Sequence, residues 1–361
     1  MGKAVYLNGL NGLRAIAAIS VLFAHTTMDG ISDFGIPHIQ LPLAGYGVTL
    51  FFVISGFLIT YLLLLEREKN GINIRNFYVR RILRIWPIYY LFIIICFVAS
   101  TFFPVFNSVF TSGISWYVFM LPNIPFIFST GILILVHYWS IGVEEQFYLF
   151  WPWFVKYSLK RLLIYTIILF FVLFFVKSGM WIIYGKNNLV YRILGVNRFH
   201  CMLIGAFGAI LFYAKNVIYL QLLQNKYLQI ISWLIFILVG IDLIQIPAPI
   251  SSEFFGLISL VLVIGQVSNE SKIINLELPL FNFLGKISYG IYVFHPIVIF
   301  LLSFLIKNIN INIYLKYGLV YSSVFSITII LAFFSYNFYE MPFLKLKTKF
   351  SSILSSNSKN A

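Results

Sequence analysis

The stretch GYGVTLFFVISGFLITYLLLL, residues 45–65, contains no charged side chain. At 1.5 Å per residue, a helix of this length measures about 30 Å, which matches the hydrocarbon core of a bilayer. The rest of the chain has the same character: 61% of its 361 residues are hydrophobic and only 10% are charged, and the mean hydropathy is +0.94. A soluble domain needs about a quarter of its surface residues charged, and a disordered chain is poor in aromatic residues. The composition therefore excludes both classes.

Nine further apolar runs are candidates for crossing the membrane, at 10–28, 85–103, 139–155, 162–184, 199–214, 228–246, 253–268, 287–306 and 317–339. We therefore expect an all-α, polytopic transmembrane bundle of about ten helices. It forms one domain over 1–345, and the Ser-rich end, 346–361, is expected to be a disordered cytoplasmic tail. In 104–138 three prolines interrupt an uncharged stretch. This stretch lies in the interface, re-enters the membrane or adds a pair of crossings.

Basic residues indicate the orientation of the helices, because Lys and Arg accumulate in cytoplasmic loops. With the N-terminus inside, nineteen basic residues fall in cytoplasmic segments and five in outer ones. This distribution predicts that both termini are cytoplasmic. It also accounts for the net charge of +14, so no nucleic-acid partner is expected. Three of the outer basic residues lie in 186–198, where they are suited to an acidic substrate. We expect no cleaved signal peptide, no disulfide between Cys96 and Cys201, and no metal site.

Charged side chains inside a membrane span are costly and point to function. Arg14 and His25, in the first apolar run, are eleven residues apart. On a helix this spacing places them on one face, roughly 16 Å apart along the axis. They are therefore expected to line a common cavity. The alternative is that each side chain anchors one end of the helix at the membrane surface.

Two adjacent carboxylates, Glu144 and Glu145, lie in the segment WSIGVEEQFYLFWP. Ser140, Glu144 and Tyr148 share one i, i+4 row, so Glu144 is expected to face inward. The orientation brings the start of this helix to the same side as His25, where Glu144 is expected to orient a histidine base. The alternative is a structural pair between Glu144 and an arginine of another helix.

Arginines cluster in NIRNFYVRRILRIWPIYY, residues 73–90, at the cytoplasmic entrance of the third span. Arg80 and Arg84 are one turn apart, with Arg81 beside them. Guanidinium groups bind phosphates through paired hydrogen bonds, so this cluster is a candidate phosphate site. An anchor for the helix, or a site for anionic lipid headgroups, explains the same pattern.

The segment FLGKISYGIYVFHPIVIF, residues 283–300, places His295 near the middle of a span. Tyr292 precedes it by one turn and Ser288 by two turns, on roughly the same side. These three residues are candidates for the same site. A buried histidine that is hydrogen-bonded to the neighbouring tyrosine is the structural alternative.

Together these segments resemble the acyltransferase-3 family, which are integral-membrane enzymes that O-acylate surface polysaccharides and related acceptors. The resemblance spans roughly residues 7 to 345. It rests on seven motifs in the family's order: LNGLRAIAAISVLFAH, FFVISGFLIT, FYVRRILRIWPIYY, WSIGVEEQFYLFWP, RFHCMLIGAFGAIL, GKISYGIYVFHP and YEMPFLK.

The resemblance implies transfer of an acyl group, most often acetyl, from a cytoplasmic acyl-CoA to a hydroxyl of a cell-surface glycan or glycolipid. It implies a location in the bacterial inner membrane, with donor, acceptor and membrane lipids as partners and no permanently bound cofactor. His25 falls at the position of the family's catalytic histidine, and Arg14 at that of the paired arginine, which is also expected to bind acyl-CoA. Glu144 is the expected catalytic partner of His25 from its place on its own helix. The other residues expected in the site bind acyl-CoA (Arg80, Arg81, Arg84) or support the reaction and the substrate (Glu145, Tyr148, Ser140, His295, Tyr292, Ser288).

The chain departs from the family in two places. The family often has an acidic residue after the Arg-Phe pair, whereas this chain has His200 and Cys201 there, which leaves that acidic role without a residue. Many members also carry an extra C-terminal hydrolase-like domain. This chain is expected to lack it, so that the membrane domain completes the transfer.

Two other functions fit charged residues inside a membrane. The first is an ion- or proton-coupled transporter, in which Arg, His and Glu form a proton path, although the paired halves common in transporters are not apparent. The second is a non-catalytic component of polysaccharide assembly. If a covalent acyl-enzyme forms, Ser140 and Ser288 are its candidate carriers. The acceptor sugar, the acyl chain and the oligomeric state stay open at this point.

Overall fold

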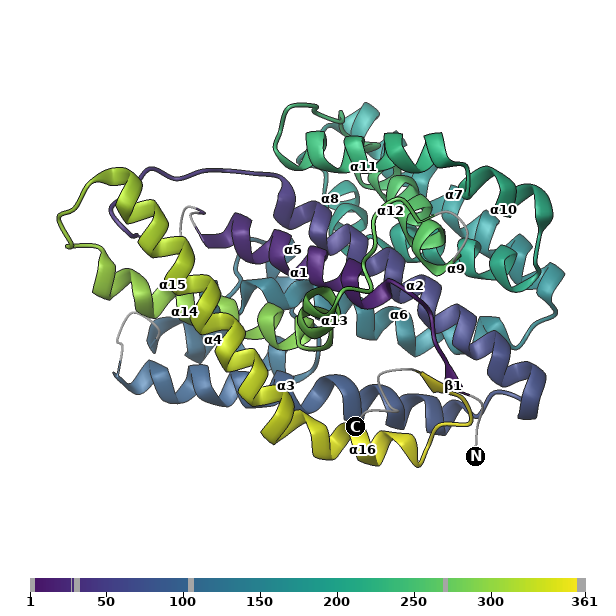
Figure 1. Ribbon diagram of the computed structural model, residues 1–361, viewed down its shortest axis with the longest axis horizontal. Coiled ribbons are helices and arrows are strands. Elements are labelled where there is room, and N and C mark those ends of the chain that lie inside the picture. Colours follow the sequence, from purple (N-terminus) through teal and green to yellow (C-terminus); the bar gives the residue numbers. More distant parts are fainter. Residues whose placement is uncertain (1–3, 27, 29–32, 103–106, 269–271, 356–361) are drawn as a thin grey trace.

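The computed structural model describes residues 4–26, 28, 33–102, 107–268 and 272–355. In these ranges the chain is a bundle of helices (Figure 1), which confirms the all-helical class. Its only strands in the described ranges are two residues long, β1 (Ala4–Val5) and β2 (Leu354–Ser355). The helices of the first half are α1 (Leu10–Thr26), α2 (Leu43–Asn70), α3 (Ile74–Phe102), α4 (Asn107–Val118), α5 (Asn123–Ile127), the 3₁₀ helix η2 (Leu133–Tyr138), α6 (Trp139–Val155) and α7 (Leu159–Tyr184). Those of the second half are α8 (Leu189–Asn197), α9 (Phe199–Tyr213), α10 (Val217–Leu223), α11 (Lys226–Gly240), α12 (Ser251–Val267), α13 (Pro279–Lys286), α14 (Ser288–Ile306), α15 (Ile313–Phe334), the π-helix η3 (Ser335–Glu340) and α16 (Met341–Thr348).

Each of the ten predicted apolar runs coincides largely with a helix. Six helical stretches of the described chain are long and apolar enough to cross a membrane: Leu43–Asn70, Ile74–Phe102, Leu159–Tyr184, Leu189–Tyr213, Ser288–Ile306 and Ile313–Thr348. The bent pair α10 and α11, which meet at 53°, raises the number to seven, and α1 and α12 are shorter apolar helices. These helices support an integral, multi-pass membrane protein. The count of ten crossings and the cytoplasmic termini stay predictions.

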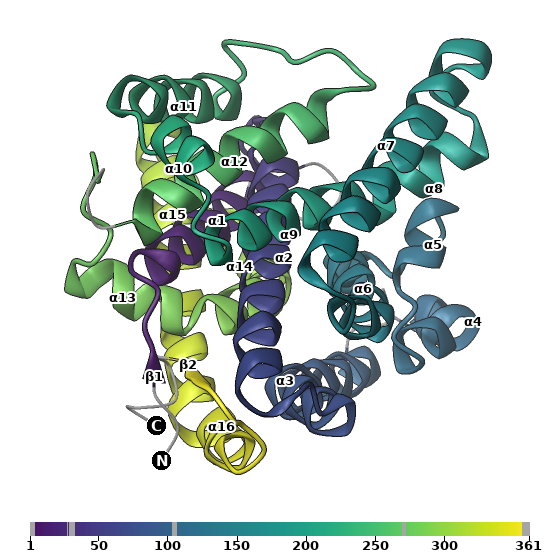
Figure 2. The same cartoon turned by 90° about the vertical axis from the view of Figure 1, so that its right-hand side faces the viewer.

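The surface of α7 fits a lipid environment. Figure 2 shows α7 and α8 projecting at the margin of the bundle. Large apolar side chains of α7 are exposed, among them Phe175 at 64%, Ile182 at 72% and Ile183 at 70%. An apolar helix that is not covered by protein is stable where the surrounding solvent is itself apolar.

The segment 104–138, whose topology the sequence left open, is broken into short helices. Residues 103–106 lie outside the described residues. The rest forms α4, α5 and η2, and each is shorter than a bilayer crossing. Pro122 immediately precedes α5, in keeping with the preference of proline for the start of a helix.

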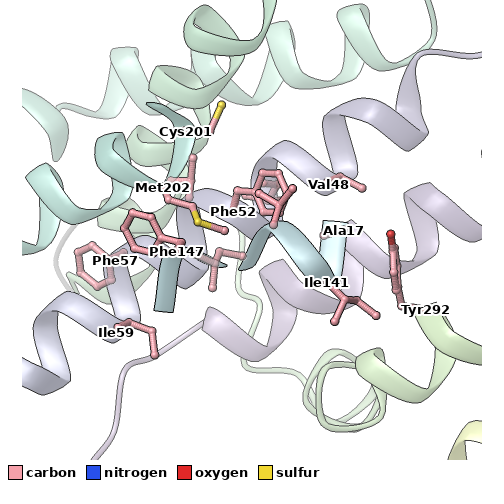
Figure 3. Close-up of a cluster of buried hydrophobic side chains, with 14 of the residues drawn as sticks. Ala17, Val48, Phe52, Phe57, Ile59, Ile141, Phe147, Cys201, Met202 and Tyr292 are labelled. Carbon is pink, nitrogen blue, oxygen red and sulfur yellow. The ribbon is translucent and has the colours of Figure 1, made fainter. Parts of the chain in front are cut away.

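The core of the bundle is built around α2, which runs through its middle (Figure 2). Phe52 of α2, Phe147 of α6 and Met202 of α9 meet in a buried apolar cluster (Figure 3). Two glycines allow α2 and α9 to approach closely. A Cβ on Gly56 would lie 2.0 Å from the Met202 carbonyl oxygen, and one on Gly205 would lie 2.1 Å from that of Val53. Small residues at helix crossings permit this packing in membranes.

A buried ionic network joins α7, α9 and α12. Lys177 Nζ lies 2.5 Å from Glu253 Oε1 and donates to the Ser252 hydroxyl at 3.0 Å. His200 Nε2 lies 3.3 Å from the same carboxylate oxygen. Lys177, Glu253 and His200 are each at most 4% exposed. Glu253 of α12 therefore places a carboxylate beside His200, and it neutralises a lysine of the apolar helix α7.

The two ends of the described chain meet. β1 pairs with β2 in parallel, with Ala4 opposite Leu354 and Val5 opposite Ser355. Residues 346–355 of the predicted tail contact the bundle, since Arg80 and Lys69 donate to the carbonyls of Phe350 and Ser352. Residues 356–361 of that tail lie outside the described residues. The division into domains stays a prediction.

We predict that Gly205→Ala weakens the crossing of α2 and α9, because the new methyl group meets backbone atoms of α2 that cannot rotate away. The expected cost is about 1–3 kcal/mol, seen as a lower Tm of the detergent-purified protein. The control is Gly179→Ala on α7, where a Cβ meets nothing within 4 Å. Equal Tm values for the two variants would contradict close packing at Gly205.

A second prediction concerns the buried ion pair. Glu253→Gln leaves Lys177 charged and uncompensated, so it should destabilise the protein by about 3–5 kcal/mol. Combining it with Lys177→Met should restore most of the loss. Thermal unfolding of the two single variants and the double variant measures this coupling, with exposed Lys186→Met as control. Additive losses in the double variant would show that the two side chains do not interact.

Candidate active site

A cavity of about 120 Å³ lies between α1, α2, α3, α6 and α14. Eight of the twelve residues predicted for the site line it: Arg14, Arg81, Arg84, Ser140, Glu144, Tyr148, Ser288 and Tyr292. The row Ser140, Glu144, Tyr148 thus faces inward, as the i, i+4 spacing predicted. His25, Arg80, Glu145 and His295 are the four that do not line this cavity.

Three arginines at the cavity are not paired in salt bridges among the described residues, although the Glu144 carboxylate lines the same cavity. Arg14, Arg81 and Arg84 form no salt bridge with any residue that the structure describes. Arg81 lies against the rings of Phe77 and Tyr148, 5.7 Å from each centroid, and its buried Nε has no hydrogen-bond partner in the described chain. Guanidinium groups that are partly buried without an anion are suited to bind one from outside the chain.

Arg80 differs from the other arginines of α3. Its Nη2 lies 2.6 Å from Glu66 Oε2, and its Nη1 donates to Glu66 Oε1 at 3.3 Å. The side chains are 11% and 6% exposed. Arg80 therefore forms the kind of Glu–Arg pair between helices that was the structural alternative for Glu144.

The two adjacent glutamates have different surroundings. Glu144 accepts a hydrogen bond from the Ser55 hydroxyl at 2.7 Å. Glu145 accepts one from Trp86 Nε1 at 3.1 Å, and its other oxygen is buried without a partner among the described residues. No hydrogen bond or ion pair joins Glu144 to His25 in the described chain, so the structure does not bring the predicted base and its carboxylate together.

The partner of His25 is another histidine. His25 Nδ1 lies 2.8 Å from His295 Nε2, with the rings stacked at 5.1 Å between centroids. A third histidine, His137 of η2, lies 5.2 Å from His295 and 5.4 Å from Tyr292, ring to ring. It is 2% exposed, and neither ring nitrogen has a hydrogen-bond partner among the described residues. The sequence analysis missed His137, although it is the one ionisable histidine of the stretch 104–138.

Tyr292 lies between the cavity and this histidine cluster, because it lines the cavity and contacts His137 and His295. Its hydroxyl lies 2.7 Å from the Ser140 hydroxyl and donates to the carbonyl of His137 at 2.7 Å. In Figure 3 Tyr292 stands beside Ile141 at the edge of the apolar cluster. Arg14 therefore borders the cavity directly, whereas His25 is connected to it through His295, whose ring lies 5.8 Å from that of Tyr292.

Comparisons with known proteins agree with the motifs. Residues 7–337 match a family model described as an acyltransferase domain. The chain is 29% identical over 372 residues to the O-acetyltransferase OatA of Staphylococcus aureus, an alignment that covers 94% of this chain and 57% of OatA. It is also 29% identical over 376 residues to a putative O-acetyltransferase of the same species, covering 95% of this chain and 58% of that protein. The chain thus spans less than two thirds of the length of these relatives. No solved structure matches it significantly. Because the family match covers nearly the whole chain, the resemblance is confirmed, and the protein belongs to the acyltransferase-3 family.

Proposed function

We propose that this protein is a membrane-embedded O-acetyltransferase that moves an acetyl group from cytoplasmic acetyl-CoA to a hydroxyl of a cell-surface glycan or glycolipid. One observation carries the proposal: a cavity bordered by Arg14, Arg81 and Arg84, without salt bridges in the described chain, leads to the hydroxyl groups of Ser140 and Tyr292. The family and the names of the similar proteins support the reaction class.

The donor end of the cavity suits coenzyme A. Its phosphates are polyanionic and cannot enter hydrocarbon, so they remain at the arginines. The thin pantetheine arm extends into the cavity, where the Glu144 carboxylate accepts a hydrogen bond from one of its amide N–H groups. In this proposal Glu144 positions the donor and does not orient His25, because its carboxylate accepts a hydrogen bond from Ser55 on the cavity wall and none from His25 in the described chain.

The chemical step belongs to the histidine cluster. His25 removes the proton from the acceptor hydroxyl. At the same time the hydroxyl oxygen attacks the carbonyl carbon of the thioester. The C–S bond then breaks, and the imidazolium returns the proton to the leaving thiolate. His295 holds the His25 ring through the 2.8 Å contact between their nitrogens. General-base help of this kind contributes about 10²–10⁴-fold, and positioning of the two substrates supplies most of the rest.

The proposed reaction also implies an orientation in the membrane, a cellular location and a set of partners. The arginine end faces the cytoplasm, where coenzyme A occurs, in agreement with the excess of basic residues assigned to that side. The membrane is the bacterial inner membrane, and the partners are the donor, the acceptor and the surrounding lipids. Neither nucleic acid nor a permanently bound cofactor takes part.

We predict that His25→Ala lowers acetyl transfer by at least about 10²-fold and leaves the protein in the membrane. The assay incubates membranes with labelled acetyl-CoA and extracted surface glycan, and follows thiol release that depends on the acceptor. The exposed histidine variant His38→Ala is the control. Normal transfer by His25→Ala would remove this histidine from the reaction. No acceptor-dependent release by the unmodified protein would instead favour a transporter.

The arginines of α3 should contribute unequally to the binding of acetyl-CoA. Arg84→Gln should raise the KM for acetyl-CoA by roughly tenfold, because a charged hydrogen bond to phosphate is lost. Arg75→Gln on the exposed side of the same helix should leave KM unchanged. Arg80→Gln should lower the Tm of the protein, since it leaves the Glu66 carboxylate unpaired, and should leave the KM for acetyl-CoA nearly unchanged. If Arg80→Gln changed KM and Arg84→Gln did not, Arg80 would be the donor-binding residue and Arg84 the structural one, contrary to this prediction.

A further inference from the structure

Lys347 of α16 is a buried cation at the C-terminal end of the described chain. Its exposed fraction is 9%, whereas Lys345 and Lys349 of the same segment are exposed. Lys347 lines a second cavity, of about 70 Å³, together with Arg14, Arg81 and Arg84. Like these arginines, it forms no salt bridge with a residue that the structure describes. Four positive groups therefore line one cavity, and no carboxylate is among the described residues that line it.

A third cavity, of about 30 Å³, continues from the second. Lys347 and Arg81 line both, and Ser351 joins them in the third. The one carboxylate in either lining is Glu66, and its two oxygens already bind the Arg80 guanidinium. Arg14, Arg81 and Arg84 also border the larger cavity that reaches Ser140 and Tyr292. The three cavities thus adjoin, with the cations where they meet.

The chain places Lys347 there by several contacts. Arg80 donates to the carbonyl of Phe350 at 2.8 Å, and Lys69 donates to that of Ser352 at 3.2 Å. The parallel pairing of β1 with β2 ties the residues that follow to the start of the chain. Figure 2 shows α16, β1 and β2 gathered on the side of the bundle where α3 begins. This segment therefore contributes Lys347 and Ser351 to the two smaller cavities, and no histidine is among the described residues that line them.

Gathering one buried and three half-buried positive charges around a cavity is unfavourable, since like charges repel strongly where water is scarce. The arrangement becomes favourable when a ligand brings several negative charges. A lysine contributes three donors on a compact head, and arginines contribute flat pairs of donors. Both suit phosphate oxygens.

We propose that Lys347, with Arg14, Arg81 and Arg84, binds the phosphates of the donor, and that α16 thereby forms part of the donor site. The proposal rests on the proposed function, in which the donor is an acyl-CoA. The same chemistry would also fit the phosphate of an anionic lipid headgroup, and the test separates the two sources.

The experiment measures binding to the purified full chain in nanodiscs of phosphatidylcholine, by titration with CoA and with pantetheine, which lacks phosphates. Lys347→Gln should raise the Kd for CoA about tenfold or more and leave the Kd for pantetheine unchanged. Lys345→Gln, which removes an exposed charge from the same helix, should bind CoA as the unmodified chain does. Lys347→Arg should retain binding.

A second readout separates binding from a structural role. Without ligand, Lys347→Gln should raise Tm because it relieves repulsion, and CoA should then raise Tm less than in the unmodified chain. A lower Tm without ligand, or an unchanged Kd for CoA, would overturn the role of Lys347 while leaving the proposed function intact. If the unmodified chain binds no CoA, the proposed function itself fails. A last outcome concerns lipid. If phosphatidylglycerol in the nanodiscs raises the Tm of the unmodified chain but not that of Lys347→Gln, and CoA raises neither, the site binds a lipid headgroup and this proposal is wrong.

Discussion

The architecture depends on one constraint, which is that positive side chains lie in and near the interior of a membrane protein without a salt bridge in the described chain to neutralise them. The chain contains both kinds of buried cation. Lys177 and Arg80 are each held by a carboxylate, Glu253 and Glu66, at 2.5 and 2.6 Å. Arg14 and its neighbours on α3 and α16 have no such partner in the described chain. A cation that only supports the fold is neutralised by the chain itself. Cations that line a common cavity without a salt bridge in the described chain are suited to bind an anion from outside, as we propose.

The rest of the structure connects these charges to a second region of different chemistry. The large cavity begins at the arginines and ends at the hydrogen bond between Ser140 and Tyr292. Beyond it lie His295, His25 and His137, with no carboxylate hydrogen-bonded to any of them among the described residues. The fold therefore separates a region that suits phosphates from a region that suits proton transfer. The close crossing of α2 and α9 gives the rigid core against which both regions are built. A thioester, with a charged end and a thin reactive arm, matches this division.

Much of the architecture could be predicted because a membrane span is a long apolar run, and length and composition alone identify it. The start of α3 was missed because Arg75 and Arg84 interrupt the apolar pattern there. The inward row on α6 was predicted correctly, since i, i+4 spacing is a property of one helix. The partner of His25 was not, because spacing along one helix does not determine how neighbouring helices are rotated. His137 and Lys347 had no periodic pattern around them, and only the packing of distant segments brings them to the site.

The most direct test is an experimental structure of the full chain in a lipid nanodisc with CoA bound, at a resolution that shows the phosphates. We predict phosphate density between Arg84 and Lys347, in contact with Arg14 and Arg81, with the pantetheine arm directed along the 120 Å³ cavity toward Ser140 and Tyr292. Phosphate density at another part of the protein, or a lipid headgroup between these cations while CoA binds elsewhere, would contradict it.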